Sequence, residues 1–267
     1  MGFGAPHLGA GGLIIVFILS MVFHQNFFQY VSTGPSVSAP VNRPVSRPSN
    51  GARPGGERAV QFVSFVLDDT QKTWTKLLPE QVNVPYRHAK LVLFRNSTPS
   101  ACGAADSATG PFYCPGDEKV YLDLEFFDEL SRRFGAPGEF AQAYVIAHEI
   151  GHHLQKILGI EGKVNRARQS NPSESNALSV RLELQADCFA GVWGKTTEQR
   201  HIIDQSDVQS ALGAAAAVGD DKLQQEATGR VRPESFTHGT SAQRTTWFKT
   251  GFNAGNIKAC DTFSSKQ

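Results

Sequence analysis

The stretch FAQAYVIAHEIGHHLQKIL, residues 140–158, predicts a long buried helix, and the rest of the chain is interpreted around it. Apolar residues recur at helical spacing along it, and Gly159 follows as a stop signal. His148 and His152 are four residues apart, so on a helix both imidazoles project from one face and can bind one metal ion. Glu149 is placed to reach a water molecule at that ion and to act as a general base.

The alternative interpretation of this helix is a core element with two structural histidines. That arrangement would bury two imidazoles and the carboxylate of Glu149 with nothing to pair them, which is costly. The metal-binding interpretation is therefore favoured.

A second predicted helix, residues 171–193, supplies the further ligand that such a site needs. Catalytic zinc takes three protein ligands and leaves one position for water. Glu183 and Asp187 are again four residues apart, in a segment too apolar to be mostly exposed. We expect Glu183 to be the third ligand and Asp187 to accept a hydrogen bond from the distal ring nitrogen of His148, which would fix its tautomer. The alternative is a solvated helix face.

The remaining pattern predicts an α+β domain with a small sheet followed by mostly helices. Residues 96–118 are rich in turn-forming residues. Further elements are expected as helices at 60–78, 125–134, 207–218 and 241–252 and as strands at 90–95 and 119–124. The last two helices begin at sequences that resemble capping boxes, Ser206–Gln209 and Thr240–Gln243.

The N-terminal region differs in composition from everything that follows it. The first 42 residues contain no Asp, Glu, Lys or Arg, and residues 8–23 are almost wholly apolar. With the aromatic residues that follow, this segment approaches the length of a transmembrane helix. We expect a membrane anchor within residues 1–33, with a cleaved signal peptide as the alternative. Residues 34–58 are rich in Pro, Arg and Ser and predict an extended linker, which leaves residues 59–267 as the folded domain.

Charge and cysteine content bear on partners and compartment. A formal net charge of +1 gives no electrostatic argument for nucleic acid, so no such partner is expected. The four cysteines contain no CxxC motif and allow three pairings, of which Cys102–Cys114 with Cys188–Cys260 is the most economical. Disulfides favour a location outside the cytoplasm, whereas the arginines of residues 43–58 would favour the cytoplasm by the positive-inside rule. Four buried, reduced thiols are the alternative.

These motifs together resemble a known family. The order HExxH, then ExxAD, then a late His (His238) with an Arg six positions beyond it (Arg244) is the gluzincin pattern. More specifically, the chain resembles the "putative neutral zinc metallopeptidase" family of bacterial, N-terminally anchored proteins over nearly all of residues 60–263. The resemblance is carried by Trp74, SACG (100–103), GPFYCP (110–115), VYLDLEFFDEL (120–130), FAQAYVIAHEIGHH (140–153), VRLELQADCFAGVW (180–193), FTHGTSAQR (236–244) and CDTF (260–263).

A more distant likeness is to membrane-associated gluzincins of the CAAX-protease and heat-shock-protease kind. Their His-Pro-Pro-x-x-x-Arg element is matched in spacing by HGTSAQR at 238–244, without the prolines.

The resemblance implies a membrane-tethered zinc endopeptidase that acts on peptide or protein substrates. Zn²⁺ would be bound by His148, His152 and Glu183, with Glu149 as general base. His238 would stabilise the oxyanion, and Arg244 would brace Glu183 or the domain. A strand at residues 108–115 or beside it would bind the substrate as an added strand.

The resemblance also favours a catalytic domain on the outer side of the cell membrane. His153 is expected to point away from the metal, at the surface or behind the ligands. Two other functions remain open from the sequence. One is a non-proteolytic zinc-binding scaffold or interaction module on the same fold, and the other is a small-molecule amidase.

Overall fold

The structure, a computed structural model, describes residues 54–106, 110–132 and 138–264. The predicted membrane anchor (1–33) and most of the predicted linker (34–58) lie outside the described residues. Among the residues that are described, no helix combines the length and the apolar character needed to cross a membrane.

Helix α3 (Pro54–Val82) opens the described chain and contains the predicted helix at 60–78. It begins at Pro54, so residues 54–58, which their composition assigns to the linker, form its first turns. Trp74 and Leu78 on its inner face are fully buried. Trp74 meets Phe189 edge to face, which joins this helix to the predicted helix at 171–193.

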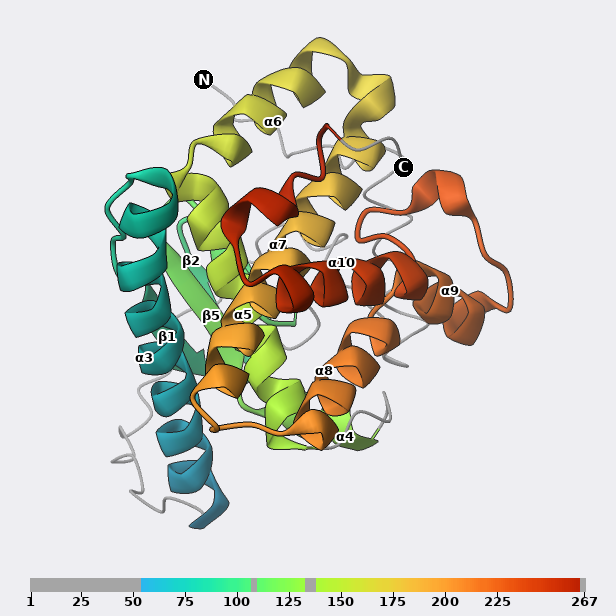
Figure 1. The fold of residues 1–267 in the computed structure, drawn as a ribbon. Coiled ribbons are helices and arrows are strands. Elements are labelled where there is room, and N and C mark those ends of the chain that lie inside the picture. Colours follow the sequence, from blue (N-terminus) through green and yellow to red (C-terminus); the bar gives the residue numbers. More distant parts are fainter. Residues whose placement is uncertain (1–53, 107–109, 133–137, 265–267) are drawn as a thin grey trace, which may run out of the picture. The chain divides into compact units, whose positions relative to one another are not determined.

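A three-stranded sheet with the order β1–β5–β4 follows (Figure 1). The predicted strands are confirmed as β1 (Lys90–Phe94) and β5 (Lys119–Asp123), which pair in parallel. Between them the chain forms β2 (Ser97–Ser100), β3 (Gly103–Asp106) and β4 (Phe112–Cys114) instead of turns alone. These strands have three or four residues each, too few for a period to be read from the sequence. Strand β4 pairs antiparallel with β5 and forms one edge of the sheet.

The second half of the chain is helical, as the sequence predicts. Its helices are α4 (Glu125–Arg132), α5 (Glu139–Ile157), α6 (Ile160–Ser170), α7 (Ser175–Gln199), α8 (Gln205–Ala217), α9 (Asp220–Thr228) and α10 (Ser241–Ala254), with short 3₁₀ turns η1 (Pro172–Glu174), η2 (Pro233–Ser235) and η3 (Ile257–Cys260). The two short helices α6 and α9 were not expected, because both are largely polar and carry too few apolar residues to show a helical period.

The structure confirms one of the two capping boxes and shifts the other. Thr240 caps α10 and Gln243 reaches back to it, as predicted. Helix α8, however, is capped by Asp204 together with Asp207, so its N-cap lies two residues before the predicted cap at Ser206. Asp is as good an N-cap as Ser, and here its carboxylate accepts two backbone N–H groups.

Close backbone contacts hold helices α5, α7 and α10 against one another. At Gly151 of α5, a Cβ atom would lie 2.9 Å from the Cα of Ala186 on α7, so the two helices touch through their backbones. At Gly251 of α10, a Cβ atom would overlap the carbonyl oxygen of Cys188. Helix α10 therefore crosses α7 as tightly as α7 packs on α5.

Both expected disulfides are present. Cys102–Cys114 joins the turn of the β2–β3 hairpin to β4, and Cys188–Cys260 joins α7 to η3 near the C-terminus. The alternative of four reduced thiols is wrong in this structure.

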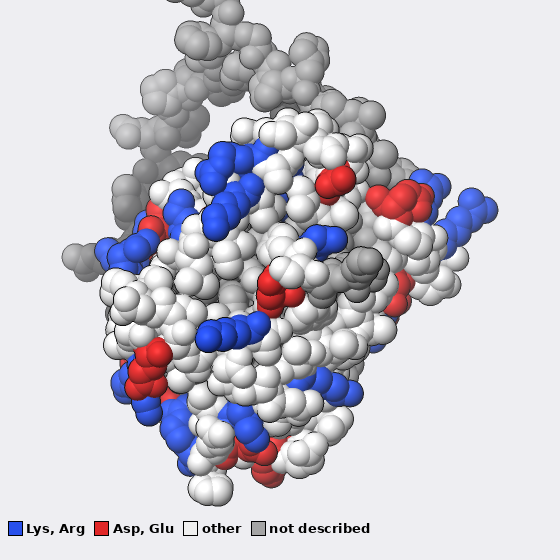
Figure 2. Space-filling model, turned by 45° about the horizontal axis from the view of Figure 1, so that its top comes forward, with Lys and Arg blue, Asp and Glu red and all other residues white. Residues whose placement is uncertain are grey.

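One face of the molecule carries charged residues of both signs. On the face drawn in Figure 2, Lys and Arg side chains lie among Asp and Glu side chains, with uncharged surface between them. A mixed surface of this kind gives little long-range steering of a ligand of either sign.

Candidate metal centre

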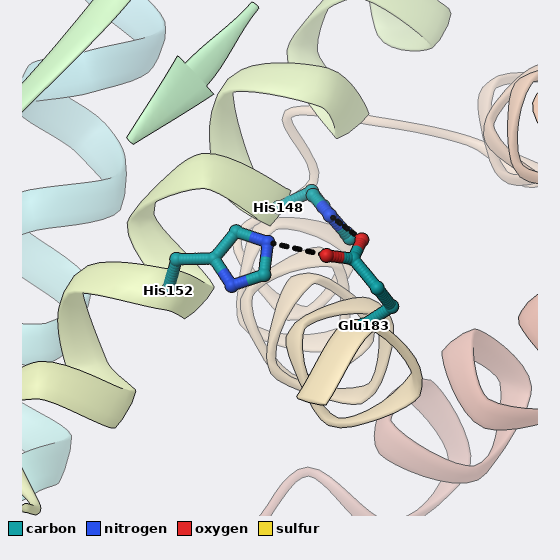
Figure 3. Close-up of side chains that lie close together, drawn as sticks. All are labelled: His148, His152 and Glu183. Atoms are coloured by element: carbon teal, nitrogen blue, oxygen red, sulfur yellow. Dashed lines mark hydrogen bonds and ion pairs between the residues drawn. The ribbon is translucent and has the colours of Figure 1, made fainter. Parts of the chain in front are cut away.

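Helices α5 and α7 bring the three predicted ligands together. The carboxylate of Glu183 lies between the imidazoles of His148 and His152 (Figure 3). Its oxygens are 3.2 Å from the Nε2 atom of His148 and 3.5 Å from the Nε2 atom of His152. One ligand atom from each residue lies within 4.8 Å of the others. The donor set is two imidazole nitrogens and one carboxylate, which suits zinc.

The side chains behind His148 hold it in one tautomer. Its Nδ1 atom is 2.8 Å from Oδ1 of Asp187, which is fully buried, so Nδ1–H donates to the carboxylate and Nε2 faces Glu183. Burial disfavours the imidazolium, but Asp187 outweighs this and raises the pKa of His148 to about 10. Since a ligating imidazole must be neutral, a metal ion has to displace a proton here.

Asp187 is in turn held by Arg244 and Tyr144. The guanidinium donates from Nε to Oδ2 of Asp187 at 2.9 Å and from a terminal nitrogen to Oδ1 at 3.0 Å. The Tyr144 hydroxyl donates to the same carboxylate and accepts from Arg244. Burial alone would raise the pKa of Asp187, but Arg244 and His148 lower it. Arg244 thus braces Asp187 directly, rather than Glu183.

Behind His152 lies a neutral amide instead of a carboxylate. Its Nδ1 atom is 2.9 Å from Oε1 of Gln155, three residues further along α5. Burial lowers the pKa of His152, and the neighbouring Glu183 carboxylate more than compensates and raises it.

Glu149 lies beside the ligands, as the general-base prediction requires. Burial raises the pKa of its carboxyl group. The backbone N–H of Tyr113, on edge strand β4, lies close enough to this carboxylate to oppose the rise of its pKa. The edge strand therefore lies beside the residue predicted to handle the proton.

His238 lies between η2 and α10, outside helices α5 and α7, and its side chain is half exposed. Its Nδ1 atom is 3.1 Å from Oδ1 of Asp220. The other oxygen of Asp220 accepts the backbone N–H groups of Thr237, His238 and Gly239. Partial burial would lower the pKa of His238, but Asp220 and then Glu183 raise it. At neutral pH this histidine is therefore biased toward the imidazolium.

His153 was expected either at the surface or behind the ligands, and the structure places it behind them. It is fully buried, with Nε2 2.6 Å from the carbonyl of Arg87 and Nδ1 2.9 Å from the hydroxyl of Tyr113. A carbonyl can only accept, so Nε2 carries the proton and Nδ1 accepts from Tyr113. His153 thereby fixes strand β4 against α5 behind the ligands.

A cavity of about 450 Å³ opens in front of the three ligands and Glu149. Its apolar part is formed by side chains of β4, α4, α5 and α7 and of the α8–α9 connection: Phe112, Phe126, Val145, Leu182 and Val218. Helix α6 contributes polar residues at the other end: Glu161, Asn165 and Arg168. His238 and Tyr113 also line it, so the three predicted ligands, Glu149 and His238 border one space.

The fold and the site define a class: an HExxH helix whose two histidines meet a glutamate from a second helix, the ligand set of His₂Glu zinc peptidases. The chain belongs to the family described as "Putative neutral zinc metallopeptidase", whose model matches residues 2–263.

The sequence is similar to proteins from several bacteria. The uncharacterized protein YpfJ of Escherichia coli (strain K12) is 47% identical over 263 residues, which cover 98% of this chain and 89% of YpfJ. The uncharacterized proteins Mb2605 of Mycobacterium bovis and Rv2575 of Mycobacterium tuberculosis are each 44% identical over 203 residues, or 72% of this chain and 66% of theirs. No solved structure matches.

Four residues of the site were not singled out from the sequence. Tyr144 and Gln155 stand four residues before His148 and three after His152, so helical spacing alone could have identified them. Tyr113 and Asp220 carry no such signal, since they reach the site from a three-residue strand and from a helix start 18 residues before His238.

Proposed function

We propose that this protein is a zinc-dependent endopeptidase. The observation that carries the proposal is the convergence of His148, His152 and Glu183 at a cavity that Glu149 also lines. When bound there, zinc would supply the Lewis acidity that activates water and polarises a peptide carbonyl.

The residues of the chain divide the proton and charge handling between them. Glu149 accepts the proton of the attacking water and returns it to the leaving amine, which a buried carboxyl of raised pKa is suited to do. His238, biased toward its cationic form by Asp220, donates a hydrogen bond to the oxyanion that develops on the carbonyl.

Strand β4 provides a place for an extended peptide. It forms an edge of its sheet, lines the cavity, and lies within the residues predicted to bind substrate. A peptide that adds to this edge would obtain main-chain hydrogen bonds along β4 and would place a bulky apolar side chain against Phe126 and Val145.

The test compares the zinc-loaded full-length chain with Glu149→Gln on a library of quenched fluorescent peptides. The wild type should cleave internal peptide bonds. Glu149→Gln should bind zinc equally well but lose on the order of 10²–10⁴-fold in rate, the range for loss of general acid–base catalysis. Equal cleavage by Glu149→Gln would refute the mechanism. Zinc binding without cleavage of any peptide would favour the scaffold or the small-molecule amidase.

We further propose that residues 1–33 anchor the chain in the cell membrane with the domain on the extracytoplasmic side. The apolar, uncharged start of the sequence and the two disulfides support this location. Thiol alkylation in intact cells, with and without reductant, tests it. Four cysteines that react without reductant would contradict the proposed side.

A further inference from the structure

Two buried glutamines connect His152 to the C-terminal end of the described chain. Gln155 on α5 is 1% exposed and Gln185 on α7 is 4% exposed. Glutamine is mostly found at the surface, and a buried side-chain amide has to satisfy both its oxygen and its nitrogen. Neither residue has a part in the proposed chemistry.

The hydrogen bonds run from His152 through Gln155 and Gln185 to the backbone carbonyl of Cys260. The carbonyl at the Cys260 end fixes which atom is the donor in each of them. The backbone carbonyl of Cys260 can only accept, so the atom of Gln185 that lies 2.8 Å from it is the donor Nε2. The oxygen of Gln185 is then left to accept from Nε2 of Gln155, at 3.2 Å.

The carbonyl of Leu182 fixes Gln155 in the same sense. It lies 2.7 Å from Nε2 of Gln155, and a flipped amide would place an oxygen against that carbonyl and against the oxygen of Gln185. Oε1 of Gln155 therefore faces Nδ1 of His152 at 2.9 Å as an acceptor. For this bond to form, Nδ1 must carry the proton, which leaves Nε2 free to ligate on the side of Glu183.

We propose that Gln155 and Gln185 are positioning residues that hold His152 in its metal-binding tautomer and thereby set the affinity of the site for zinc. This inference rests on the proposed metal site. His148 is held by the charge of Asp187, whereas His152 is held by neutral amides whose orientation is dictated by two backbone carbonyls. The Cys188–Cys260 disulfide keeps one of these carbonyls beside α7.

Two oxygens accept hydrogen bonds from Nε2 of Gln155 and so orient it: the backbone carbonyl of Leu182 and Oε1 of Gln185. Loss of Gln155 should therefore cost more than loss of Gln185. Partners of metal-ligating histidines typically contribute 10–100-fold to metal affinity. We expect losses near that range for Gln155→Leu and about 3–10-fold for Gln185→Leu, whose side chain does not touch His152.

The experiment measures the zinc affinity of the full-length chain by competition with a chromophoric chelator, together with its unfolding by urea. Gln155→Glu is the discriminating variant, because it keeps an acceptor for His152 but buries a charge. If Gln155 positions His152, the affinity for zinc should be highest in the wild type, lower in Gln155→Glu and lowest in Gln155→Leu. The urea midpoint of Gln155→Leu should nevertheless exceed that of Gln155→Glu. A role in packing alone would give Gln155→Leu both the higher affinity for zinc and the higher urea midpoint of the two variants.

Gln71→Leu is the matched control. Gln71 on α3 is also 4% exposed, and its Oε1 atom has no hydrogen-bond partner among the described residues. This variant should bind zinc as the wild type does. If Gln155→Leu matches the wild type as well, the inference is overturned while the proposed zinc site stands. If the wild type itself binds no zinc, the proposed function fails first. Should Gln155→Glu not fold, the comparison of Gln155→Leu, Gln185→Leu and Gln71→Leu decides.

Discussion

At the scale of single residues, the carboxylate of Asp187 holds together the polar network behind the metal ligands. It accepts hydrogen bonds from His148, Tyr144 and Arg244 and has no exposed surface. Arg244 is itself buried, so its charge depends on this partner. Removal of one member of a buried ion pair leaves the other charge uncompensated, which typically costs about 3–5 kcal/mol.

We predict that Asp187→Asn lowers the free energy of unfolding by about 3 kcal/mol and weakens zinc binding by about 10–100-fold. The amide cannot accept all the donors that now surround Asp187, and its own N–H groups would face them. Urea denaturation and zinc titration measure the two effects. A variant as stable as the wild type would show that Arg244 does not need this counter-charge.

Asp220 should control the pH dependence of the reaction through His238. The hydrogen bond and charge of Asp220 raise the pKa of His238 above its ordinary 6.5, so the imidazolium persists to higher pH. In Asp220→Asn the pKa of His238 should fall. The alkaline limb of the kcat/KM profile should therefore move to lower pH. A pH–rate profile measures this, and an unshifted alkaline limb would remove His238 from the proposed role.

His238 and Asp220 also make the stability of the fold depend on pH, each in a known direction. Because the pKa of His238 is raised by folding, its contribution is complete below pH 6.5 and is lost as pH rises through the raised value. Asp220 has a lowered pKa, since hydrogen bonds from His238 and from backbone N–H groups outweigh its burial. Its contribution is present above its ordinary 3.8 and is lost as pH falls through the lowered value.

Some of these residues could be predicted from the sequence and others could not, for a physical reason. His148 with His152, and Glu183 with Asp187, are related by one helical turn, so local geometry already places each pair on one face. The contact between Asp220 and His238 depends instead on a loop that wraps around one carboxylate. No spacing rule describes that loop, and only the folded chain reveals it.

At the scale of elements, the site depends on how closely α5 approaches α7. Gly151 lies inside the HExxH motif, and a Cβ atom there would meet both the Cα and the carbonyl oxygen of Ala186 at 2.9 Å. The distance between the two helices determines whether Glu183 can lie between the two imidazoles.

We predict that Gly151→Ala destabilises the protein by about 1–3 kcal/mol, as overpacking does, and weakens zinc binding because α7 is displaced. The matched control is Gly213→Ala in helix α8, where a new Cβ atom would meet nothing within 4 Å. That variant should gain up to about 1 kcal/mol from helix propensity. Chemical denaturation shows whether each variant has a lower or a higher free energy of unfolding than the wild type. If both variants were stabilised, this would argue against a close α5–α7 contact.

The long elements could be predicted from the sequence and the short ones could not. Helices α5 and α7 have 19 and 25 residues, enough for their apolar periodicity to be evident. Strands β2, β3 and β4 are defined by their partners. Strands β2 and β3 pair with each other in a hairpin whose turn is joined to β4 by a disulfide, and β4 pairs with β5. Their sequences, such as STPS and GAAD, have little strand preference of their own.

At the scale of the whole molecule, the two disulfides close loops of very different length. Cys102–Cys114 spans 12 residues and Cys188–Cys260 spans 72. From loop entropy, we predict a loss of about 3 kcal/mol when both members of the first pair are changed to Ser and about 4 kcal/mol for the second pair. Urea unfolding of the two double variants measures this. The reverse order would mean that strain or structure in the unfolded chain outweighs loop length.

We propose that His148, His152 and Glu183 together hold one zinc ion. The most direct measurement is the zinc content of the full-length wild type and of Glu183→Gln, after both are loaded with zinc and dialysed against the same weak chelator. The wild type should retain one zinc per chain, and Glu183→Gln should retain well below one. A wild type that retains no zinc, or a variant that retains as much as the wild type, would contradict it.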